Sequence, residues 1–303
     1  GEPEDLPSHL SDFDAVIATW CGSVHWIVQG LSADNQPRVG YYVQDYEPYF
    51  FPPNSKLFQM AVDSYTALPS MRPFTKTEWN RQEVLTKTGA NCAVIGSSID
   101  IDSFRPRPLG EEFPDCPLRV CALVRPNTYR RAPELTMRLL RRLSHRYANR
   151  VQITIFGVDP ADPNFAPLPK DFDWQLAGVI DAPKVEALMA QTDIFTDFSE
   201  YQAMGLTALE AMACGAAVIV PHKGGAISFA RHGENALIVD TSSEDACWES
   251  LVSLVENREM RHSLRRGAIH SVCNFPLERA ALNILKTLFQ PSQPAALSEG
   301  GLL

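Results

Sequence analysis

The densest set of residues that could do chemistry lies between Ser199 and Pro221, in the stretch SEYQAMGLTALEAMACGAAVIVP. An apolar strand pattern ends at Ser199, a short loop holds Gly205, and a helix pattern runs from there to Gly215. The backbone N–H groups of Gly205 and Leu206 would point out of the helix N-terminus, where the helix dipole attracts an anion. Ligands of parallel α/β sheets bind beyond the carboxyl ends of the strands. The stretch therefore predicts an anion site in the loop around Gly205.

Two arginines follow another strand pattern. RVCALV, 119–124, is followed directly by Arg125 and, five residues later, by Arg130. A guanidinium can donate two parallel hydrogen bonds to phosphate oxygens. The pair therefore suits a diphosphate, and the alternative is that both arginines pair with acids on the surface.

These features together resemble the signature of glycosyltransferase family 4, the retaining enzymes of the GT-B fold. The hallmark of that family is E-x7-E followed by a run such as ALEAMACG. Arg125 and Arg130 match the Arg and Lys, five apart, that hold its donor diphosphate. SSIDIDSF, 97–104, resembles the family's NGID-x-x-x-F segment, and KGGAISF, 223–229, resembles the loop that closes over the donor. The resemblance covers roughly residues 13 to 290.

The chain departs from the family's pattern in three places. Gln202 stands at the first glutamate of E-x7-E, whereas Glu210 is the second, and Ser228 stands where the glycine-glycine loop usually has glutamate. The N-terminal half also lacks the opening strand and glycine-rich loop of such enzymes. Gln202 and the segment YYVQDYEPYFFP, 41–52, resemble the corresponding residues of the bacterial rhamnosyltransferases of surface polysaccharide synthesis.

The resemblance implies a role for each matching residue. Arg125, Arg130 and the helix N-terminus after Gly205 would stabilise the departing diphosphate, Glu210 would accept hydrogen bonds from the ribose, and Gln202 would position the hydroxyls of the sugar. No metal is expected, because cationic side chains and a helix dipole bear the charge of the leaving group. The residues expected to bind the donor are Arg125, Arg130, Gly205, Leu206, Thr207, Glu210, Gly224 and Gly225.

Two of the carboxylate patterns have a second interpretation. Glu210 follows Thr207 by three residues, the spacing of a capping box, so it could merely cap its helix. Asp100 and Asp102 spell DxD, which binds a metal in other proteins, but here they fall in the segment before the linker. We favour ribose binding for Glu210 and no metal for the aspartates.

The acceptor side is less well defined. His25 follows the first strand pattern, and the loop QDYEP, 44–48, offers Asp45 and Glu47 beside Tyr46. Carboxylates beside an aromatic ring are suited to hold a sugar, and a histidine can act as an acid or base near neutral pH. The alternatives are a structural histidine and an ordinary polar loop.

The second half of the chain alternates strand and helix patterns, which predicts a parallel sheet with right-handed crossovers. Strands are predicted at 119–124, 151–157, 174–180, 193–199, 216–221 and 237–240, and helices at 132–150, 185–191, 206–215 and 246–256. Nine arginines lie between Arg119 and Arg150, where Glu134 is the only acid. Those on the helix indicate either a solvated basic face or a docking surface for anionic lipid or a partner.

The first half has the same alternation but fewer elements. Strands are predicted at 13–19, 38–44 and 92–98, and a helix over 75–89, capped near Thr75 or Thr77 and ended by Gly89. The predicted domains are a partial N-terminal domain over 1–104, a proline-rich linker over 105–117, and a nucleotide-sugar domain over 118–275. A helix over 276–290 would cross back to the first domain, and a disordered tail would occupy 291–303. The small number of strands leads us to expect that the chain is part of a longer polypeptide.

Composition limits the function classes. The 303 residues include 45% hydrophobic and 21% charged residues, which is typical of a globular protein. A net charge of −9 argues against a nucleic-acid binder. The seven cysteines never form CxxC, which fits reduced thiols in the cytosol.

The sequence therefore predicts an α/β protein of GT-B type, with two Rossmann-like domains facing across a cleft. Its expected function is a retaining transfer of rhamnose or another hexose from a nucleotide diphosphate sugar to a glycan or lipid-linked glycan, in the cytoplasm or at the inner face of the membrane, alone or in a synthase complex. The alternatives are a non-catalytic nucleotide- or glycan-binding domain of a larger synthase and a sugar-nucleotide epimerase. No cofactor is expected.

Overall fold

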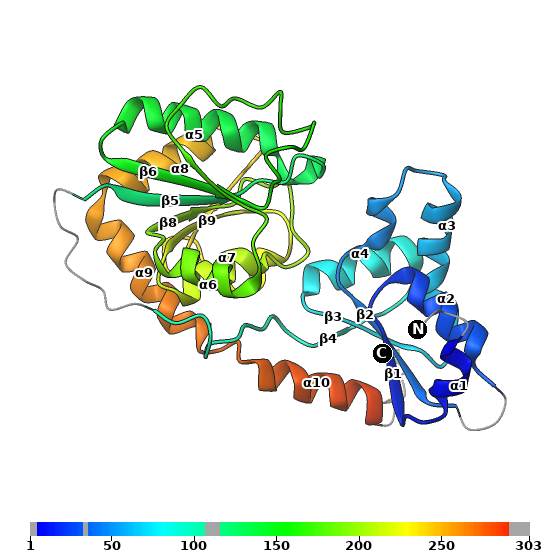
Figure 1. Ribbon diagram of the computed structural model, residues 1–303. Helices are drawn as coiled ribbons and strands as arrows, with labels where there is room; N and C mark the ends of the chain where they lie inside the picture. Colours follow the sequence, from blue (N-terminus) through cyan, green and yellow to red (C-terminus); the bar gives the residue numbers. More distant parts are fainter. Residues whose placement is uncertain (1–4, 33–35, 107–115, 291–303) are drawn as a thin grey trace, which may run out of the picture. The chain divides into compact units, whose positions relative to one another are not determined.

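The computed structural model describes residues 5–32, 36–106 and 116–290. These residues form two compact units (Figure 1). Unit 1 holds the described residues 5–32, 36–75, 83–95 and 281–290, and unit 2 holds the described residues 76–82, 96–106 and 116–280. The predicted tail, 291–303, and most of the predicted linker lie outside the described residues.

Unit 2 is built on a six-stranded sheet in which every neighbouring pair is parallel. Its order is β10-β9-β8-β5-β6-β7, so the order of connection reverses between β5 and β8. The strands are β5 (Leu118–Leu123), β6 (Val151–Phe156), β7 (Gln175–Gly178), β8 (Ile194–Thr196), β9 (Ala217–Pro221) and β10 (Leu237–Val239). All six were predicted from the sequence, and the reversal marks the point where ligands bind in such sheets.

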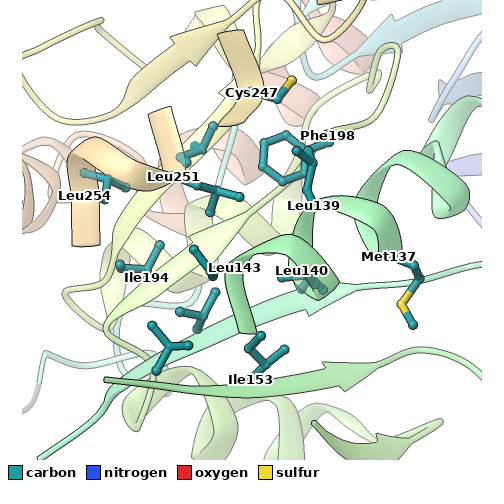
Figure 2. Packing of buried hydrophobic residues seen from close by; sticks show 14 of the residues in the cluster. Met137, Leu139, Leu140, Leu143, Ile153, Ile194, Phe198, Cys247, Leu251 and Leu254 are labelled. Atoms are coloured by element: carbon teal, nitrogen blue, oxygen red, sulfur yellow. The ribbon is translucent and has the colours of Figure 1, made fainter. Parts of the chain in front are cut away.

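Helices cover both faces of this sheet. One face carries α5 (Pro133–Tyr147) and α8 (Glu244–Glu256), and the other carries α6 (Ala182–Ala190), α7 (Leu206–Ala213) and α9 (Arg258–Val272). Short 3-10 helices, η4 (Tyr129–Arg131) and η5 (Gly225–Ser228), follow β5 and β9. Figure 2 shows how α5 forms its share of the core, with Leu139, Leu140 and Leu143 packed near Ile153 and Leu251. The 3.6-residue spacing of these leucines is what folds the segment as an amphipathic helix.

The sequence analysis missed α9 because charged residues lie on its buried face. Arg261 and Arg265 are each 3% exposed. The guanidinium of Arg261 donates to Leu254 O at the end of α8, and that of Arg265 donates to Gly215 O, each at 2.6 Å. These arginines satisfy carbonyls at helix ends, and their charge hides the apolar stripe in the sequence pattern.

The basic face of α5 is paired within unit 2. Arg138 lies 2.9 Å from Glu244, Arg141 lies 3.3 Å from Asp171, and Arg146 lies 3.2 Å from Glu256. The guanidinium of Arg142 lies 4.1 Å from the ring centre of Trp248. Because these partners offset the positive charge, the structure favours a solvated face over a docking surface for anionic lipid.

Unit 1 has a smaller parallel sheet of order β1-β2-β3-β4. Its strands are β1 (Ala15–Ala18), β2 (Arg38–Val43), β3 (Arg72–Thr75) and β4 (Ala93–Val94). Its other elements are α1 (Leu6–Leu10), α2 (Cys21–Gly30), α3 (Lys56–Asp63), η2 (Glu47–Phe50), η3 (Ser64–Thr66) and the later turns of α4 (Glu78–Thr88) and α10 (Leu277–Phe289). Strand β3 was not predicted, since it is short and contains Pro73. The helix predicted from Thr75 begins instead at Glu78, because Thr75 belongs to that strand.

The end of α10 is held in unit 1 by two arginines. Arg72 donates to the carbonyls of Thr287 at 2.9 Å and Gln290 at 2.6 Å, and Arg38 donates to Leu288 O at 3.1 Å. Positive side chains at a helix C-terminus complement the helix dipole. Residues up to Ala280 group with unit 2 and the rest of the helix with unit 1. Among the described residues, no helix is both long enough and apolar enough to cross a lipid bilayer.

Candidate functional site

The N-terminus of α7 lies at the carboxyl end of β8, as the sequence predicts. Gly205 is its N-cap residue and has φ 87°, a left-handed conformation that glycine adopts without strain. The amides of Ala208 and Leu209 donate to Gly205 O at 3.1 and 3.2 Å. The N–H groups of Leu206 and Thr207 precede these bonds and have no acceptor within the helix. They are the donors that an anionic group beyond the helix end would meet.

Glu210 lies one turn into α7 and has an unusual environment. Burial raises its pKa from the ordinary value to about 7, and the nearby ammonium of Lys76 acts in the opposite direction. The capping-box interpretation is wrong, because the N-cap residue is Gly205 and Thr207 is already the second helical residue. Glu210 is therefore a half-buried carboxyl that can change its charge near neutral pH.

Gln202 is buried and bonded within its own loop. Its side-chain amide donates to Asp197 Oδ2 at 3.1 Å and to Ser199 Oγ at 2.7 Å. Its backbone pairs with Gly224, and its carbonyl accepts a hydrogen bond from Gly225 N at 2.6 Å. The amide donors that were expected to hold a sugar are thus engaged inside the protein, and Gln202 shapes the loop.

The glycine-glycine loop requires both of its glycines. A Cβ at Gly224 would lie 2.4 Å from Gln202 O, and one at Gly225 would lie 1.9 Å from Ala203 O. Ser228, which replaces the expected glutamate, donates to Gly225 O at 2.7 Å and lies 2.8 Å from Ser97 Oγ. Gly224 and Gly225 therefore let this loop pack directly against the backbone of residues 202–203.

The two predicted arginines lie on the loop that follows β5. Arg125 is exposed, and Arg130 is half-buried in η4. The carbonyl of Arg130 accepts a hydrogen bond from Glu200 N at 2.8 Å, and its guanidinium lies 5.4 Å from the ring centre of Tyr201. The structure thus brings Arg130 to the loop that leads into α7.

Tyr201, Lys223 and Lys76 were missed by the sequence analysis. The Lys223 ammonium also lies 5.4 Å from the ring centre of Tyr201, and the ring of Trp79 lies 5.3 Å from it. A positive charge over an aromatic face is favourable. The sequence could have indicated Lys223, because it directly precedes Gly224 in the glycine-glycine loop. It could not have indicated Lys76, which is far from Glu210 in the sequence.

The residues predicted for the acceptor side have structural partners in unit 1. His25 Nε2 donates to Met60 O at 2.9 Å. Glu47 is 2% exposed, and its carboxylate accepts from Cys21 N at 2.6 Å at the start of α2. Asp45 is 5% exposed and accepts from Tyr46 N at 2.9 Å. Because both carboxylates are buried, the structure favours the structural interpretation of this loop.

Asp100 and Asp102, the residues of the DxD sequence, lie in a turn. Asp100 Oδ1 accepts hydrogen bonds from Asp102 N at 3.0 Å and Ser103 N at 3.1 Å, and Oδ2 accepts from Ser103 Oγ at 2.8 Å. These bonds hold the pKa of Asp100 below its ordinary value. Within residues 5–32, 36–106 and 116–290, no three His, Cys, Asp or Glu side chains gather in a way that could hold a metal ion.

Thr77 connects the first turn of α4 to this site. Its hydroxyl accepts from Asn80 N at 3.2 Å as a helix cap and donates to Ala203 O at 2.7 Å. Thr77→Ala is expected to lower the free energy of unfolding by about 1–2 kcal/mol, measured by urea titration. Thr77→Ser should retain most of the stability. Equal losses in both variants would mean that the Thr77 methyl group, rather than its hydroxyl, matters.

A family match covers most of the residues of this site. Residues 173–271 match the family described as "Glycosyl transferases group 1". Over 101 residues the chain is 32% identical to D-inositol 3-phosphate glycosyltransferase of Salinispora arenicola, a match that covers 33% of this chain and 22% of the relative. Over 300 residues it is 25% identical to the O-antigen biosynthesis protein RfbC of Myxococcus xanthus, covering 97% of this chain and 22% of the relative.

A solved structure extends the likeness to the whole fold. Alr3699/HepE of Anabaena, crystallised with UDP and glucose, matches with a TM-score of 0.78 at 15% identity, over 95% of this chain and 81% of that one. At 15% identity, this match shows a shared fold and nothing about substrates. The predicted GT-B type, two α/β units with parallel sheets, is confirmed. The chain spans about a fifth of the length of the two curated relatives.

Proposed function

We propose that this chain is the catalytic part of a glycosyltransferase that uses a nucleotide diphosphate sugar. The observation that carries the proposal is the α7 N-terminus with Glu210 one turn inside it and Arg130 beside the preceding loop. Helix N–H groups and a guanidinium suit a diphosphate, and a carboxylate suits ribose hydroxyls. The group 1 match over residues 173–271 supports this assignment.

The finer proposal concerns the sugar and the product. The likeness to RfbC covers nearly the whole chain, and Gln202 and residues 41–52 resemble those of rhamnosyltransferases. Both support transfer of rhamnose or another hexose during surface polysaccharide synthesis. The acceptor is then a glycan or a lipid-linked glycan. Retention follows if the acceptor attacks on the side from which the diphosphate leaves and a phosphate oxygen takes its proton.

The direct test is a screen of nucleotide sugars. Thermal shift with UDP-, GDP- and dTDP-linked sugars should single out a donor, because a ligand that binds only the folded state raises the melting temperature. Radiolabelled transfer from that donor to cell-surface glycan then tests turnover. If no nucleotide sugar shifts the melting temperature, the proposal is wrong.

One observation favours a non-catalytic alternative. Residue 202 is a glutamine, so no carboxylate occupies the first position of E-x7-E. The amide of Gln202 is also engaged with Asp197 and Ser199. A nucleotide- or glycan-binding domain of a larger synthase would need none. Both functions predict binding, and only the enzyme consumes the donor.

The pKa of Glu210 predicts a pH-dependent affinity. Ribose hydroxyls donate hydrogen bonds to the ionised carboxylate, so binding favours loss of its proton. Because burial raises the pKa of the free protein's Glu210 to about 7, affinity should rise with pH up to that value and then level off. We expect UDP to bind about tenfold more tightly near pH 8 than near pH 6.

Calorimetric titration of UDP across this pH range provides the measurement. Glu210→Gln is the matched control, since the amide keeps the shape and cannot titrate. UDP itself gains charge in this range, so the comparison is the difference between the two pH profiles. Identical profiles would show that Glu210 does not contact the ligand.

A further inference from the structure

A pocket lies in unit 2, on the side of the sheet that carries α5 and α8. Its volume is about 830 Å³, within the range of small-molecule sites. It is bordered by the first turn of α5 and by the loops after β5, β6, β8, β9 and β10. A site assembled from the carboxyl ends of five strands is the kind of place where parallel sheets bind ligands.

This pocket adjoins the proposed donor site and shares the loops after β8 and β9 with it, but the two have different principal residues. Its lining residues include Glu200 and Lys223 but not Arg125, Gln202 or Glu210. The hydrogen bond from Glu200 N to Arg130 O joins the loops after β5 and β8. The chain then continues to α7, which packs on the opposite face of the sheet from α5.

Most of the acidic and basic side chains that border the pocket lie close to a neighbour of the opposite kind. The Lys223 ammonium lies 3.5 Å from Glu200, and His222 Nδ1 lies 3.6 Å from Asp240. Arg138 lies 2.9 Å from Glu244. Glu134, in the first turn of α5, adds a further carboxylate to the lining, so the pocket has no excess of positive charge to attract a phosphate or a carboxylate. Its polar groups suit a neutral ligand that both donates and accepts hydrogen bonds.

Several of these polar groups are held in place by the protein. The Asn127 amide donates to Asp162, and the Asn164 amide donates to the Asn127 carbonyl oxygen. Asp240 accepts hydrogen bonds from Ser242 N at 3.0 Å and Ser242 Oγ at 2.7 Å. Fixed side chains lose little conformational entropy when they bind a ligand.

An aromatic ring stands at the edge of the pocket. Tyr129 is 90% exposed, whereas Phe198, which also lines the pocket, is 1% exposed. A fully exposed aromatic ring beside fixed amides and carboxylates matches the two chemical faces of a sugar. The apolar face of the sugar stacks on the ring, and its hydroxyls bond to the polar groups.

We propose that this pocket binds a neutral saccharide, separately from the nucleotide sugar. The ligand class is a mono- or oligosaccharide without phosphate or carboxylate. A glycan held here would keep a growing polysaccharide on the protein between transfers. The binding itself does not depend on whether unit 2 uses a nucleotide sugar.

The test is retention of the full chain on an array of neutral bacterial oligosaccharides, rhamnose-containing glycans included. We expect at least one glycan to be retained, and Tyr129→Ala and Asn164→Ala each to weaken its binding about tenfold. Tyr49→Ala, which removes a ring that is 41% exposed in unit 1, is the matched control and should bind like the parent. Circular dichroism confirms that the variants are folded.

A competition experiment separates this proposal from the donor site. Saturating UDP should leave glycan retention unchanged, and Tyr129→Ala should leave UDP affinity unchanged. The proposal is overturned if the parent retains no neutral glycan, if both pocket variants bind like the parent, or if UDP displaces the glycan. Failure of UDP to bind at all contradicts only the proposed donor site.

Discussion

Arg125→Ala and Arg130→Ala are each expected to weaken the binding of a nucleoside diphosphate by about 1.5–3 kcal/mol, or roughly ten- to 150-fold. A hydrogen bond between a guanidinium and a phosphate has this strength because both partners are charged. Arg130 is already held beside Tyr201 and the loop before α7, so little side-chain entropy is lost on binding. Calorimetric titration with UDP measures the effect.

The nucleoside provides the first control for this prediction. Affinity for uridine should barely change in either variant, because uridine has no phosphate. Arg142→Ala is the control for removal of a positive charge. Arg142 belongs to α5, where its guanidinium lies over the ring of Trp248 from α8, and it is outside the loops around α7. If Arg125→Ala and Arg130→Ala bind UDP like the parent, both arginines are surface residues and the diphosphate site lies elsewhere.

The strands of unit 2 and its helices other than α9 could be predicted from the sequence to within a few residues because their signals are local. Buried strands read as apolar runs, and Gly205 and Gly215 mark the start and end of α7. The strand predicted over 193–199 stops at Thr196, since Asp197 and Ser199 bond to each other and turn the chain. Such side-chain competition with the strand is local too, but the apolar pattern does not show it.

The parts that the sequence could not predict depend on contacts between distant residues. The pKa of Glu210 reflects burial against elements that the pattern cannot place, with Lys76 acting on it from more than a hundred residues away in the sequence. Glu47 lies beside Tyr46 in a loop, which in the sequence suggests a sugar ligand. In the folded protein its carboxylate is buried and accepts a hydrogen bond at the start of α2. Residue type and spacing indicate which groups could do chemistry, and only packing decides which of them remain accessible.

Gln202 is expected to matter for turnover through the loop that it holds. Gln202→Ala removes two hydrogen bonds, to Asp197 and to Ser199, and leaves the Asp197 carboxylate with one donor fewer. The backbone pairing with Gly224 remains, so the fold should persist. We expect the barrier to sugar transfer to rise by about 1–3 kcal/mol, a loss of roughly five- to 150-fold in kcat/KM with the donor identified in the screen.

Gln202→Glu distinguishes a hydrogen-bonding role from a chemical one. Sequence reasoning alone suggests that this variant keeps much of the activity, because only the hydrogen-bonding pattern of the side chain changes. The structure predicts otherwise, since a carboxylate here would lie about 3 Å from the like charge of Asp197. Gln202→Glu should therefore be impaired near neutral pH and recover as the pH falls and one carboxyl of the pair is protonated.

Glu200 is the competing residue, two positions earlier in the same loop. It is exposed and pairs with Lys223 at 3.5 Å, a surface ion pair whose loss has little effect on stability. We therefore expect Glu200→Ala to retain near-parental kcat/KM while Gln202→Ala loses it, measured side by side with the same donor. Loss confined to Glu200→Ala would show that Glu200 acts at the transferred sugar and that the first position of E-x7-E has been assigned two residues too late. Equal loss in both variants would instead make the whole 200–202 loop, with its contact to Arg130, the element that positions the donor.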